Sequence, residues 1–277
     1  MTQLTPWERL RSSRARSTAP EALAPLADDE YWRVRRSVAD NANAAPDVLA
    51  HLADDPDPDV RSAVAWNRST PAPTLERLAA DDHRSVRCGV ARNRVAPAAV
   101  LARLAQDRED VVRFAVSKNT STPTAALAVL ADDPDPGIRA AVAAHPNADA
   151  ATLDVLAGAL PRVPEHDSAA ADPADVPEAE RAALTAARAR QRVAFDRVER
   201  MTADSSAVLI RRLVAFNRHT AEVTLERLAG DDDDWVRWEV ADNPRTPRGV
   251  VERLAGDPDT RVRAAARTHL DGGHRSD

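Results

Sequence analysis

The sequence contains a single cysteine, Cys88, among its 277 residues. One cysteine cannot form an intramolecular disulfide or supply a multi-cysteine metal site, which excludes a disulfide scaffold, a cysteine-ligated iron–sulfur cluster and a zinc ribbon. The longest unbroken apolar stretch, Ala125 to Ala131, is far shorter than the roughly 20 residues that a membrane span needs. Together with a polar, arginine-rich N-terminus, these absences predict a cytoplasmic protein without membrane attachment.

Aromatic residues are also scarce, at 3%, and glycine occurs only eight times, whereas proline occurs 20 times. Sheets favour aromatic and β-branched residues and exclude proline from their interiors, so this composition disfavours an all-β fold. Lysine occurs once, as Lys118, and the 38 basic residues are outnumbered by 44 acidic ones. The formal net charge of −6 makes nucleic acid an unlikely partner, because proteins that bind it usually carry a basic surplus.

The sequence does contain an internal repeat of 26 residues. A Val-Arg or Ile-Arg dipeptide recurs at this spacing five times and, after an interruption, three times more. A fixed period between about 20 and 50 residues is the signature of a solenoid. Counted from the first residue of the dipeptide, apolar residues recur at 0, +4 and +5 and leucines at +15 and +18, which predicts two short helices per unit. Position 0 is occupied by Val34, Val60, Val86, Val112, Ile138, Ile210, Val236 and Val262.

Local sequence predicts where these helices begin and end. Asp57-Pro58 and Asp135-Pro136 match an N-cap residue followed by proline at the first helical position. A Thr-Pro pair, as at Thr70, predicts the N-cap and first residue of the second helix. The asparagine at +7 predicts a left-handed residue that caps the first helix, with a ladder that binds an extended peptide as the alternative. The asparagines are Asn41, Asn67, Asn93, Asn119, Asn217 and Asn243, and His145 replaces the asparagine in the fifth unit.

The repeat resembles a known family. The string V-R-x-x-V-A-x-N-x-x-T-P-x-x-x-L-x-x-L-A-x-D runs without mismatch from Val60 to Asp81 and with one departure from Val112 to Asp133. This string is similar to the variant leucine-rich repeat family, whose members are related in shape to HEAT repeats. The resemblance implies an all-α, right-handed α-solenoid of 26-residue two-helix repeats and little about activity. Some members carry a cysteine-rich iron–sulfur module, but this chain lacks those cysteines, so we expect no cofactor.

One insertion interrupts the repeats. Residues 158–177 are rich in alanine, proline and acidic residues and predict a flexible loop, which a helix to about Met201 follows. We therefore expect one continuous solenoid domain: a cap with repeats 1–5 at residues 1–157, the insertion at 158–202, and repeats 6–8 with a polar tail from His269 at 203–277. The insertion is interpreted as a passive addition, with a lid or docking arm as the alternative.

The repeat arginine is preceded six residues earlier by an aspartate in every unit except that of Arg211, as in Asp81 and Arg87. HEAT repeats show a similar spacing, and there the pairs form a ladder across adjacent units, which is the interpretation we favour. The alternative is a phosphate-binding stripe, but a phosphate binder would leave its arginines unneutralised. Acidic runs lack the glycine and glutamate of a calcium loop, and scattered histidines predict no metal site. Because no catalytic motif is present, we expect no enzyme.

Positions +2, +3 and +6 lie opposite the apolar side on a helical wheel and are predicted to face solvent. This variable face holds four of the nine aromatic residues, interleaved with arginine and lysine. Aromatic and arginine residues are frequent anchors of protein interfaces. Packing of these residues against neighbouring units is the alternative. The candidate partner-binding residues are Arg36, Trp66, Arg92, Phe114, Lys118, Arg212, Phe216 and Trp238.

The sequence thus predicts a non-catalytic repeat scaffold that binds a protein or peptide through the variable face of its first helices. The alternative is a nucleic-acid-binding HEAT-like protein. Such a protein could be an enzyme similar to the DNA alkylation-repair glycosylases, which use aromatic residues and a carboxylate. Trp235 and Trp238 beside Asp232 to Asp234 would be the corresponding residues.

Overall fold

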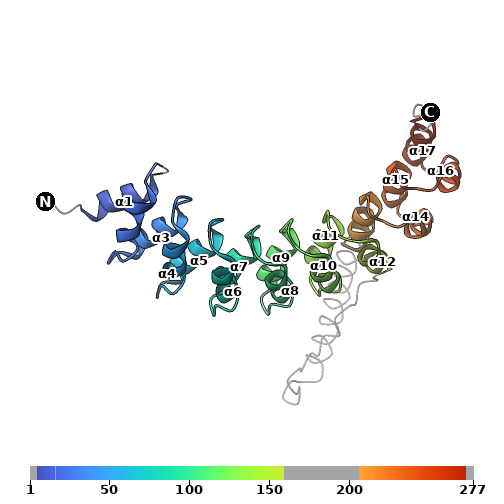
Figure 1. Ribbon diagram of the computed structural model, residues 1–277. Coiled ribbons are helices and arrows are strands. Elements are labelled where there is room, and N and C mark those ends of the chain that lie inside the picture. Colours follow the sequence, from blue (N-terminus) through green and yellow to red (C-terminus); the bar gives the residue numbers. More distant parts are fainter. Residues whose placement is uncertain (1–4, 16, 159–205, 273–277) are drawn as a thin grey trace, which may run out of the picture. The chain divides into compact units, whose positions relative to one another are not determined.

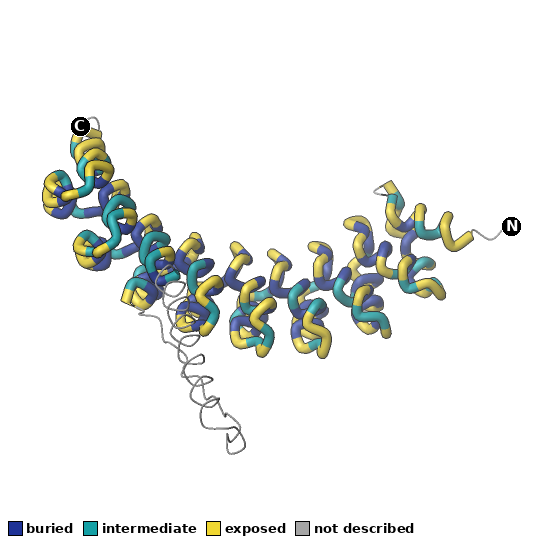
Figure 2. The backbone as a smooth tube through the Cα atoms, turned by 180° about the vertical axis from the view of Figure 1, so that it is seen from behind, coloured by how far each residue is buried: buried dark blue, intermediate teal, exposed yellow. Residues whose placement is uncertain are grey.

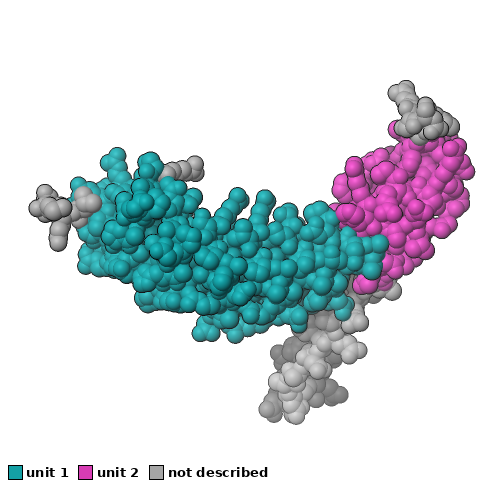
Figure 3. All heavy atoms as spheres, in the orientation of Figure 1, with its two compact units in different colours: residues 1–152 teal, residues 153–277 magenta. Residues whose placement is uncertain are grey.

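The computed structural model describes residues 5–15, 17–158 and 206–272, and within these ranges every regular element is a helix (Figure 1). The chain divides into two compact units, residues 1–152 (unit 1) and residues 153–277 (unit 2), which Figure 3 colours separately. The insertion predicted at 158–202 lies outside the described residues, except for Gly158 at the end of a helix.

Two helices alternate in each repeat, as the sequence predicted. An N-terminal cap precedes them, with α1 (Pro6–Arg14), α2 (Pro20–Leu23) and the 3-10 helix η1 (Ala24–Leu26). The first helices are α3 (Trp32–Asp40), α5 (Pro58–Trp66), α7 (Arg84–Arg92), α9 (Asp110–Lys118), α11 (Pro136–Ala143), residues 206–216, α15 (Asp234–Asp242) and α17 (Thr260–Gly272). The second helices are α4 (Pro46–Leu52), α6 (Ala72–Leu78), α8 (Ala98–Leu104), α10 (Thr124–Leu130), α12 (Ala150–Gly158), α14 (Glu222–Leu228) and α16 (Arg248–Leu254). The all-α solenoid of two-helix repeats is confirmed.

The core is a strip of small aliphatic residues shared by neighbouring repeats. Val60, Val64, Ala65 and Leu75 have no exposed surface, and Leu78 is also buried. Consecutive first helices pack directly on one another, and in unit 1 the second helices lie in a row of their own (Figure 1). Figure 2 shows the buried residues as a dark blue strip along the helices. Helices of seven to nine residues are marginal alone, so the stacking of neighbours supplies their stability.

The predicted starts of the first helices are confirmed, and these helices end at the repeat asparagine as predicted, but the predicted conformation of that asparagine is wrong. The Asp57 carboxylate accepts the backbone N–H of Asp59 at 2.8 Å, and the Asp135 carboxylate accepts that of Gly137 at 2.6 Å. At the other end, Asn67 has an extended backbone with φ −70° and ψ 129°. No non-glycine residue in the described part of the chain has a positive φ, so the asparagines do not adopt the left-handed conformation.

The Thr-Pro pairs also differ from prediction. The N-cap residue of α6 is Pro71, which cannot cap with a side-chain hydrogen bond, and not Thr70. The buried Thr70 hydroxyl instead donates to the carbonyl oxygen of Val64 at 2.6 Å, six residues earlier. Thr122 and Thr246 make the same bond to the carbonyls of Val116 and Val240. The threonine therefore satisfies a carbonyl at the end of the first helix, where helical partners are lacking.

The last repeat extends further than predicted. Helix α17 continues to Gly272, and therefore includes His269, which the sequence placed in a polar tail. His269 occupies the +7 position counted from Val262, and its Nδ1 lies 2.9 Å from the carbonyl oxygen of Ala241 in the preceding first helix. A histidine thus replaces the repeat asparagine in the eighth unit, as His145 does in the fifth.

Candidate protein-interaction surface

The repeat asparagines join consecutive units through the main chain. Asn67 Nδ2 donates to the carbonyl oxygens of Ala39 at 2.7 Å and Asn41 at 2.9 Å, both in the preceding unit. Its Oδ1 accepts the backbone N–H of Ser69 at 2.9 Å. Both amide protons are used within the solenoid, so the side chain has no donor left for an extended peptide. The same contacts recur at Asn93, Asn119 and Asn243.

The repeat arginines form a ladder across adjacent units, as predicted. Arg87 donates from Nε and Nη2 to the carboxylate of Asp107, at 2.7 and 3.0 Å. Its Nη1 donates to the carbonyl oxygens of Asp81 and Asp82, at 2.8 and 3.0 Å. The carboxylate therefore comes from the next unit, 20 residues later, while the aspartate six residues earlier contributes its main-chain carbonyl.

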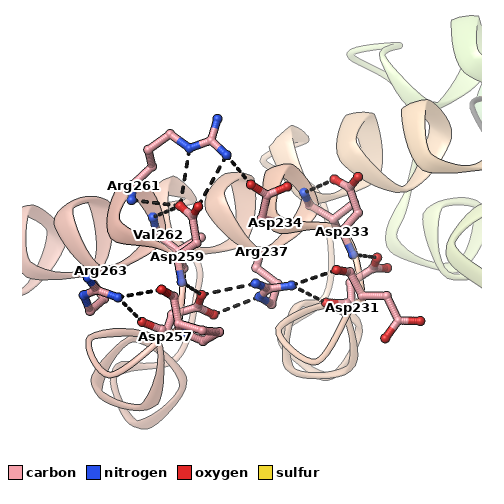
Figure 4. A network of polar contacts seen from close by, with 12 residues as sticks. Asp231, Asp233, Asp234, Arg237, Asp257, Asp259, Arg261, Val262 and Arg263 are labelled. Carbon is pink, nitrogen blue, oxygen red and sulfur yellow. Dashed lines mark hydrogen bonds and ion pairs between the residues drawn. The ribbon is translucent and has the colours of Figure 1, made fainter.

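This arrangement repeats along both units. Figure 4 shows it in unit 2, where Arg237 lies between the carbonyl of Asp231 and the carboxylate of Asp257. The first rung, which Arg9 of α1 makes with Asp29, was not predicted, although its 20-residue spacing matches that of the other rungs. The other ion pairs, with N–O distances of 2.5 to 2.8 Å across the ladder, are Arg35–Asp55, Arg61–Asp81, Arg113–Asp133 and Arg211–Asp231.

The side chains of the ladder carboxylates are buried, with exposed fractions of 3 to 9%. Burial alone would raise the pKa of the Asp107 carboxyl, but hydrogen bonds from Arg87 and from the backbone N–H of Glu109 outweigh it and lower that pKa. Burial is likewise outweighed at Asp81 and Asp257, whose pKa values are lowered. Each paired arginine is therefore neutralised within the solenoid, which argues against the phosphate-binding stripe. An open depression lined by Asp81, Asp82, Arg87, Asp107 and Arg108 belongs to this ladder.

The variable face differs in part from the helical-wheel prediction. Position +6 is exposed in α3, α5, α7 and α9, but position +3 is buried throughout unit 1. A side chain at +3 points at the preceding unit: a Cβ on Gly89 would lie 2.7 Å from Cβ of Ala65. Position −1, which sequence analysis left out, faces solvent instead. Val111, Leu209 and Trp235 occupy it with exposed fractions of 43%, 46% and 41%.

Both predicted aromatic residues of unit 1 are exposed, and each is paired with a cation. The Trp66 side chain is 47% exposed, and the Arg92 guanidinium of the next unit lies 5.4 Å from its ring centroid. Phe114 is 38% exposed, and the Lys118 ammonium lies 5.5 Å from its ring. Arg36 pairs instead with Asp40 on its own helix, at 3.6 Å. The structure thus joins four of the five predicted residues of unit 1 into two aromatic–cation pairs.

In unit 2 two of the predicted partner-binding residues, Arg212 and Trp238, contact Trp235, which was not among the predicted ones. The guanidinium groups of Arg212 and Arg261 lie 5.0 and 4.3 Å from the ring centroid of Trp235, and the half-buried Trp238 meets its edge at 6.0 Å. Arg212 also donates to Glu239 at 3.2 Å, and burial raises the pKa of that carboxyl although Arg212 opposes the shift. Phe216 is 64% exposed and takes no part in this cluster.

Two of the acidic residues that the glycosylase alternative would use, Asp233 and Asp234, make contacts within the solenoid. The Asp233 carboxylate caps α15 by accepting the backbone N–H groups of Trp235 and Val236, at 3.0 and 3.1 Å. Asp234 forms an ion pair with Arg261. In the described part of the chain, no group of three or more His, Cys, Asp or Glu side chains could hold a metal ion. None of the described helices has the length and apolar character to cross a membrane.

Comparisons with known proteins agree with this architecture. The family model for the leucine rich repeat variant matches residues 234–259, one repeat that contains α15 and α16. A solved leucine-rich repeat variant, described as having a novel repetitive structural motif, is 22% identical, with a TM-score of 0.54, and the match covers 90% of this chain and 81% of that one. The resemblance to the variant leucine-rich repeat is confirmed, and the likeness extends to the fold alone.

Designed armadillo repeat proteins match more weakly. One, computationally designed for modular peptide recognition, is 13% identical, with a TM-score of 0.24, and the match covers 96% of this chain and 91% of that one. A second is 12% identical, with a TM-score of 0.19 and coverage of 98% and 95%. No curated protein matches the chain.

Proposed function

We propose that this variant leucine-rich repeat solenoid is a non-catalytic, cytoplasmic scaffold that binds a protein or peptide through the exposed face of its first helices. The observation that carries the proposal is the pair of exposed aromatic–cation contacts in unit 1, Trp66 with Arg92 and Phe114 with Lys118. A chain with 3% aromatic residues places these two where they are 47% and 38% exposed. Aromatic and arginine side chains are enriched among the residues that dominate binding energy at protein interfaces.

The residues that recur in every repeat make the contacts that hold neighbouring units together. The asparagine donors are bound to the preceding unit, and the ladder arginines are bound to aspartates of the next. The residues that vary from unit to unit at −1, +2 and +6 remain for recognition, which is how stacked repeats generally present a binding surface. In unit 2 the corresponding surface is the Trp235 cluster with Arg212 and Trp238.

The proposal can be tested by affinity capture with the full chain. A Trp66→Ala, Phe114→Ala variant removes two exposed side chains from the first helices. A matched control, Val129→Ala, Val223→Ala, removes two exposed apolar side chains from second helices, where they are 46% and 71% exposed. Both variants should remain folded, because none of the four side chains belongs to the buried core.

We expect a captured protein to be retained by the wild type and the control and lost with the aromatic variant. Its purified form should then bind the aromatic variant more than tenfold more weakly, because each interface hot spot contributes about 2 kcal/mol. Equal retention by all three proteins would refute the proposed surface.

A further inference from the structure

The carboxyl ends of the first helices in the middle of unit 1 form a basic edge. Trp66, Arg92 and Lys118 are the last residues of α5, α7 and α9, and Arg68 and Arg94 follow two residues after Trp66 and Arg92. All five side chains are exposed. Because they occupy equivalent places in consecutive stacked repeats, they line one edge of the unit. We call these five residues the basic edge.

The four cations of the basic edge are not neutralised by the protein. Within the part of the chain that the structure describes, none of them has an ion pair. Arg92 and Lys118 contact aromatic rings only through cation–π interactions. The segments that form this edge, residues 66–69, 92–95 and 118–121, contain no aspartate or glutamate. This is a local surplus of positive charge in a chain with a net charge of −6.

The amino ends of the same helices carry the opposite charge. Residues 54–59, 81–84 and 107–110 contain nine aspartates and glutamates and two arginines, Arg84 and Arg108. A first helix of nine residues separates the two edges by only about 13 Å at 1.5 Å per residue. The helix macrodipole favours a cation in the last turn, but it does not explain the second arginine beyond the C-cap or the exposed tryptophan beside it.

We infer that the basic edge binds an extended, acidic segment of a partner protein, with carboxylates at about every third residue and apolar side chains between them. This inference rests on the proposed function and names the chemistry of the partner. Stacked helices lie about 8 to 10 Å apart, and an extended chain rises about 3.3 Å per residue, so three peptide residues span one repeat. Arginine guanidinium groups match carboxylates with two parallel hydrogen bonds, and Trp66, Phe114 and Val95 supply exposed apolar surface beside them.

The same features disfavour a nucleic-acid strand. A strand would carry a negative charge on every nucleotide, and its phosphates would approach the acidic amino ends of these helices within about two Debye lengths at physiological salt. A peptide segment can place its few carboxylates on the cations and turn neutral side chains toward the acidic edge. The narrow width of the basic edge therefore suits a peptide better.

A peptide selection on the intact chain tests the inference. Displayed random 12-residue peptides are selected on the wild-type protein, and the affinities of the selected peptides are then measured by fluorescence anisotropy. The test variant is Arg68→Gln, Arg94→Gln. The control variant, Arg77→Gln, Arg103→Gln, removes the same two charges from exposed positions on the second helices of the same repeats. A 12-nucleotide oligothymidylate is measured in parallel.

We expect the selected peptides to be rich in aspartate and glutamate, to bind the test variant about tenfold more weakly, and to bind the control variant within about twofold of the wild type. Neutral or basic peptides, equal losses in both variants, no enrichment at all, or tighter binding of the oligothymidylate would each overturn the inference. If capture of a partner still depended on Trp66 and Phe114, the proposed function would stand while the acidic chemistry failed. If capture did not depend on Trp66 and Phe114 either, both the proposed function and the acidic-segment inference would be rejected.

Discussion

Arg87 Nε lies 2.7 Å from Oδ2 of Asp107, although 20 residues separate them, and each side chain is only 7% exposed. The same guanidinium donates to the carbonyl oxygens of Asp81 and Asp82. One side chain therefore holds together the end of one repeat, its own first helix and the start of the next repeat. The ladder fixes the stacking of the units, and four hydrogen bonds from the guanidinium offset the cost of desolvating it.

Replacing Arg87 with alanine should destabilise unit 1. The change leaves the Asp107 carboxylate buried without its cation, and breaking a buried ion pair in this way costs about 3 kcal/mol or more. Urea unfolding followed by circular dichroism should show a lower midpoint. Arg77→Ala is the matched control, because the Arg77 side chain is 55% exposed and its ion pair with Asp54 is worth less than about 1 kcal/mol. Equal midpoints for the two variants would contradict the structural role of the ladder.

The ladder also predicts a loss of stability in acid. The pKa of the Asp107 carboxyl is lowered from its ordinary value of 3.8, so folding favours the ionised form. This stabilisation is present above pH 3.8 and is lost as the pH falls toward the lowered pKa. The difference in unfolding free energy between the wild type and Asp107→Asn should therefore be largest near pH 6 and shrink as the pH falls below about 4. A difference that stays constant over this range would show that ionisation of Asp107 contributes nothing.

The period and the presence of a charge ladder could be predicted from sequence because both depend on spacing that every unit shares. The carboxylate partner was not predicted, because it lies 20 residues after the arginine and not six residues before it. The conformations of Asn67 and Thr70 could not be predicted, because the Asn67 amide donates to carbonyls of the preceding unit and the Thr70 hydroxyl donates to a carbonyl of the preceding helix, which capping rules do not describe. Arg9 was missed because its unit is degenerate and lacks the Val-Arg dipeptide. Its partner Asp29 could have revealed it.

The variable face was only partly predictable for a related reason. A helical wheel treats α7 as an isolated helix, on which position +3 faces away from the apolar side. In the solenoid the preceding first helix covers that side, so Gly89 is buried. The exposed face is consequently shifted toward position −1, which brings Trp235 into the cluster with Arg212. The side on which the neighbouring helix packs decides which residues reach solvent, and sequence periodicity does not predict that side.

His145 should make stability depend on pH near neutrality. Its buried ring has Nε2 2.9 Å from the carbonyl oxygen of Asn119, and its Nδ1 accepts the backbone N–H of Asn147 at 3.0 Å. Only the neutral ring with its proton on Nε2 satisfies both contacts. Burial lowers the pKa of His145 from 6.5, so its stabilising contribution is present above pH 6.5 and is lost as the pH falls toward the lowered pKa.

His145→Asn is the informative variant, because it restores the residue that the other repeats use. Thermal unfolding between pH 7.5 and pH 5 should show the wild type losing stability relative to this variant as the pH falls. His51→Asn is the control, since the His51 side chain is 60% exposed. Parallel pH profiles for the wild type and His145→Asn would indicate that the buried ring takes up a proton without cost.

Gly89 sets the distance between α5 and α7 and, through it, the position of Trp66. An added Cβ would lie 2.7 Å from Cβ of Ala65 and 3.1 Å from Cδ1 of Trp66, so the helices would have to separate. Overpacking of this kind costs about 1 to 3 kcal/mol, which exceeds the roughly 1 kcal/mol that alanine gains over glycine in a helix. We therefore expect Gly89→Ala to lower the urea midpoint and to weaken binding of a captured partner.

Gly249→Ala provides the matched comparison for Gly89→Ala. No atom lies within 4 Å of a Cβ at Gly249 in α16, so only the gain in helix propensity remains and the midpoint should stay or rise by up to about 1 kcal/mol in unfolding free energy. If both substitutions stabilised the protein, the close approach at Gly89 would be relieved by small shifts. Arg92, whose guanidinium lies over Trp66, is on the same helix as Gly89. Shifts small enough to be harmless at Gly89 would therefore also leave this cation–π pair and the binding face unchanged.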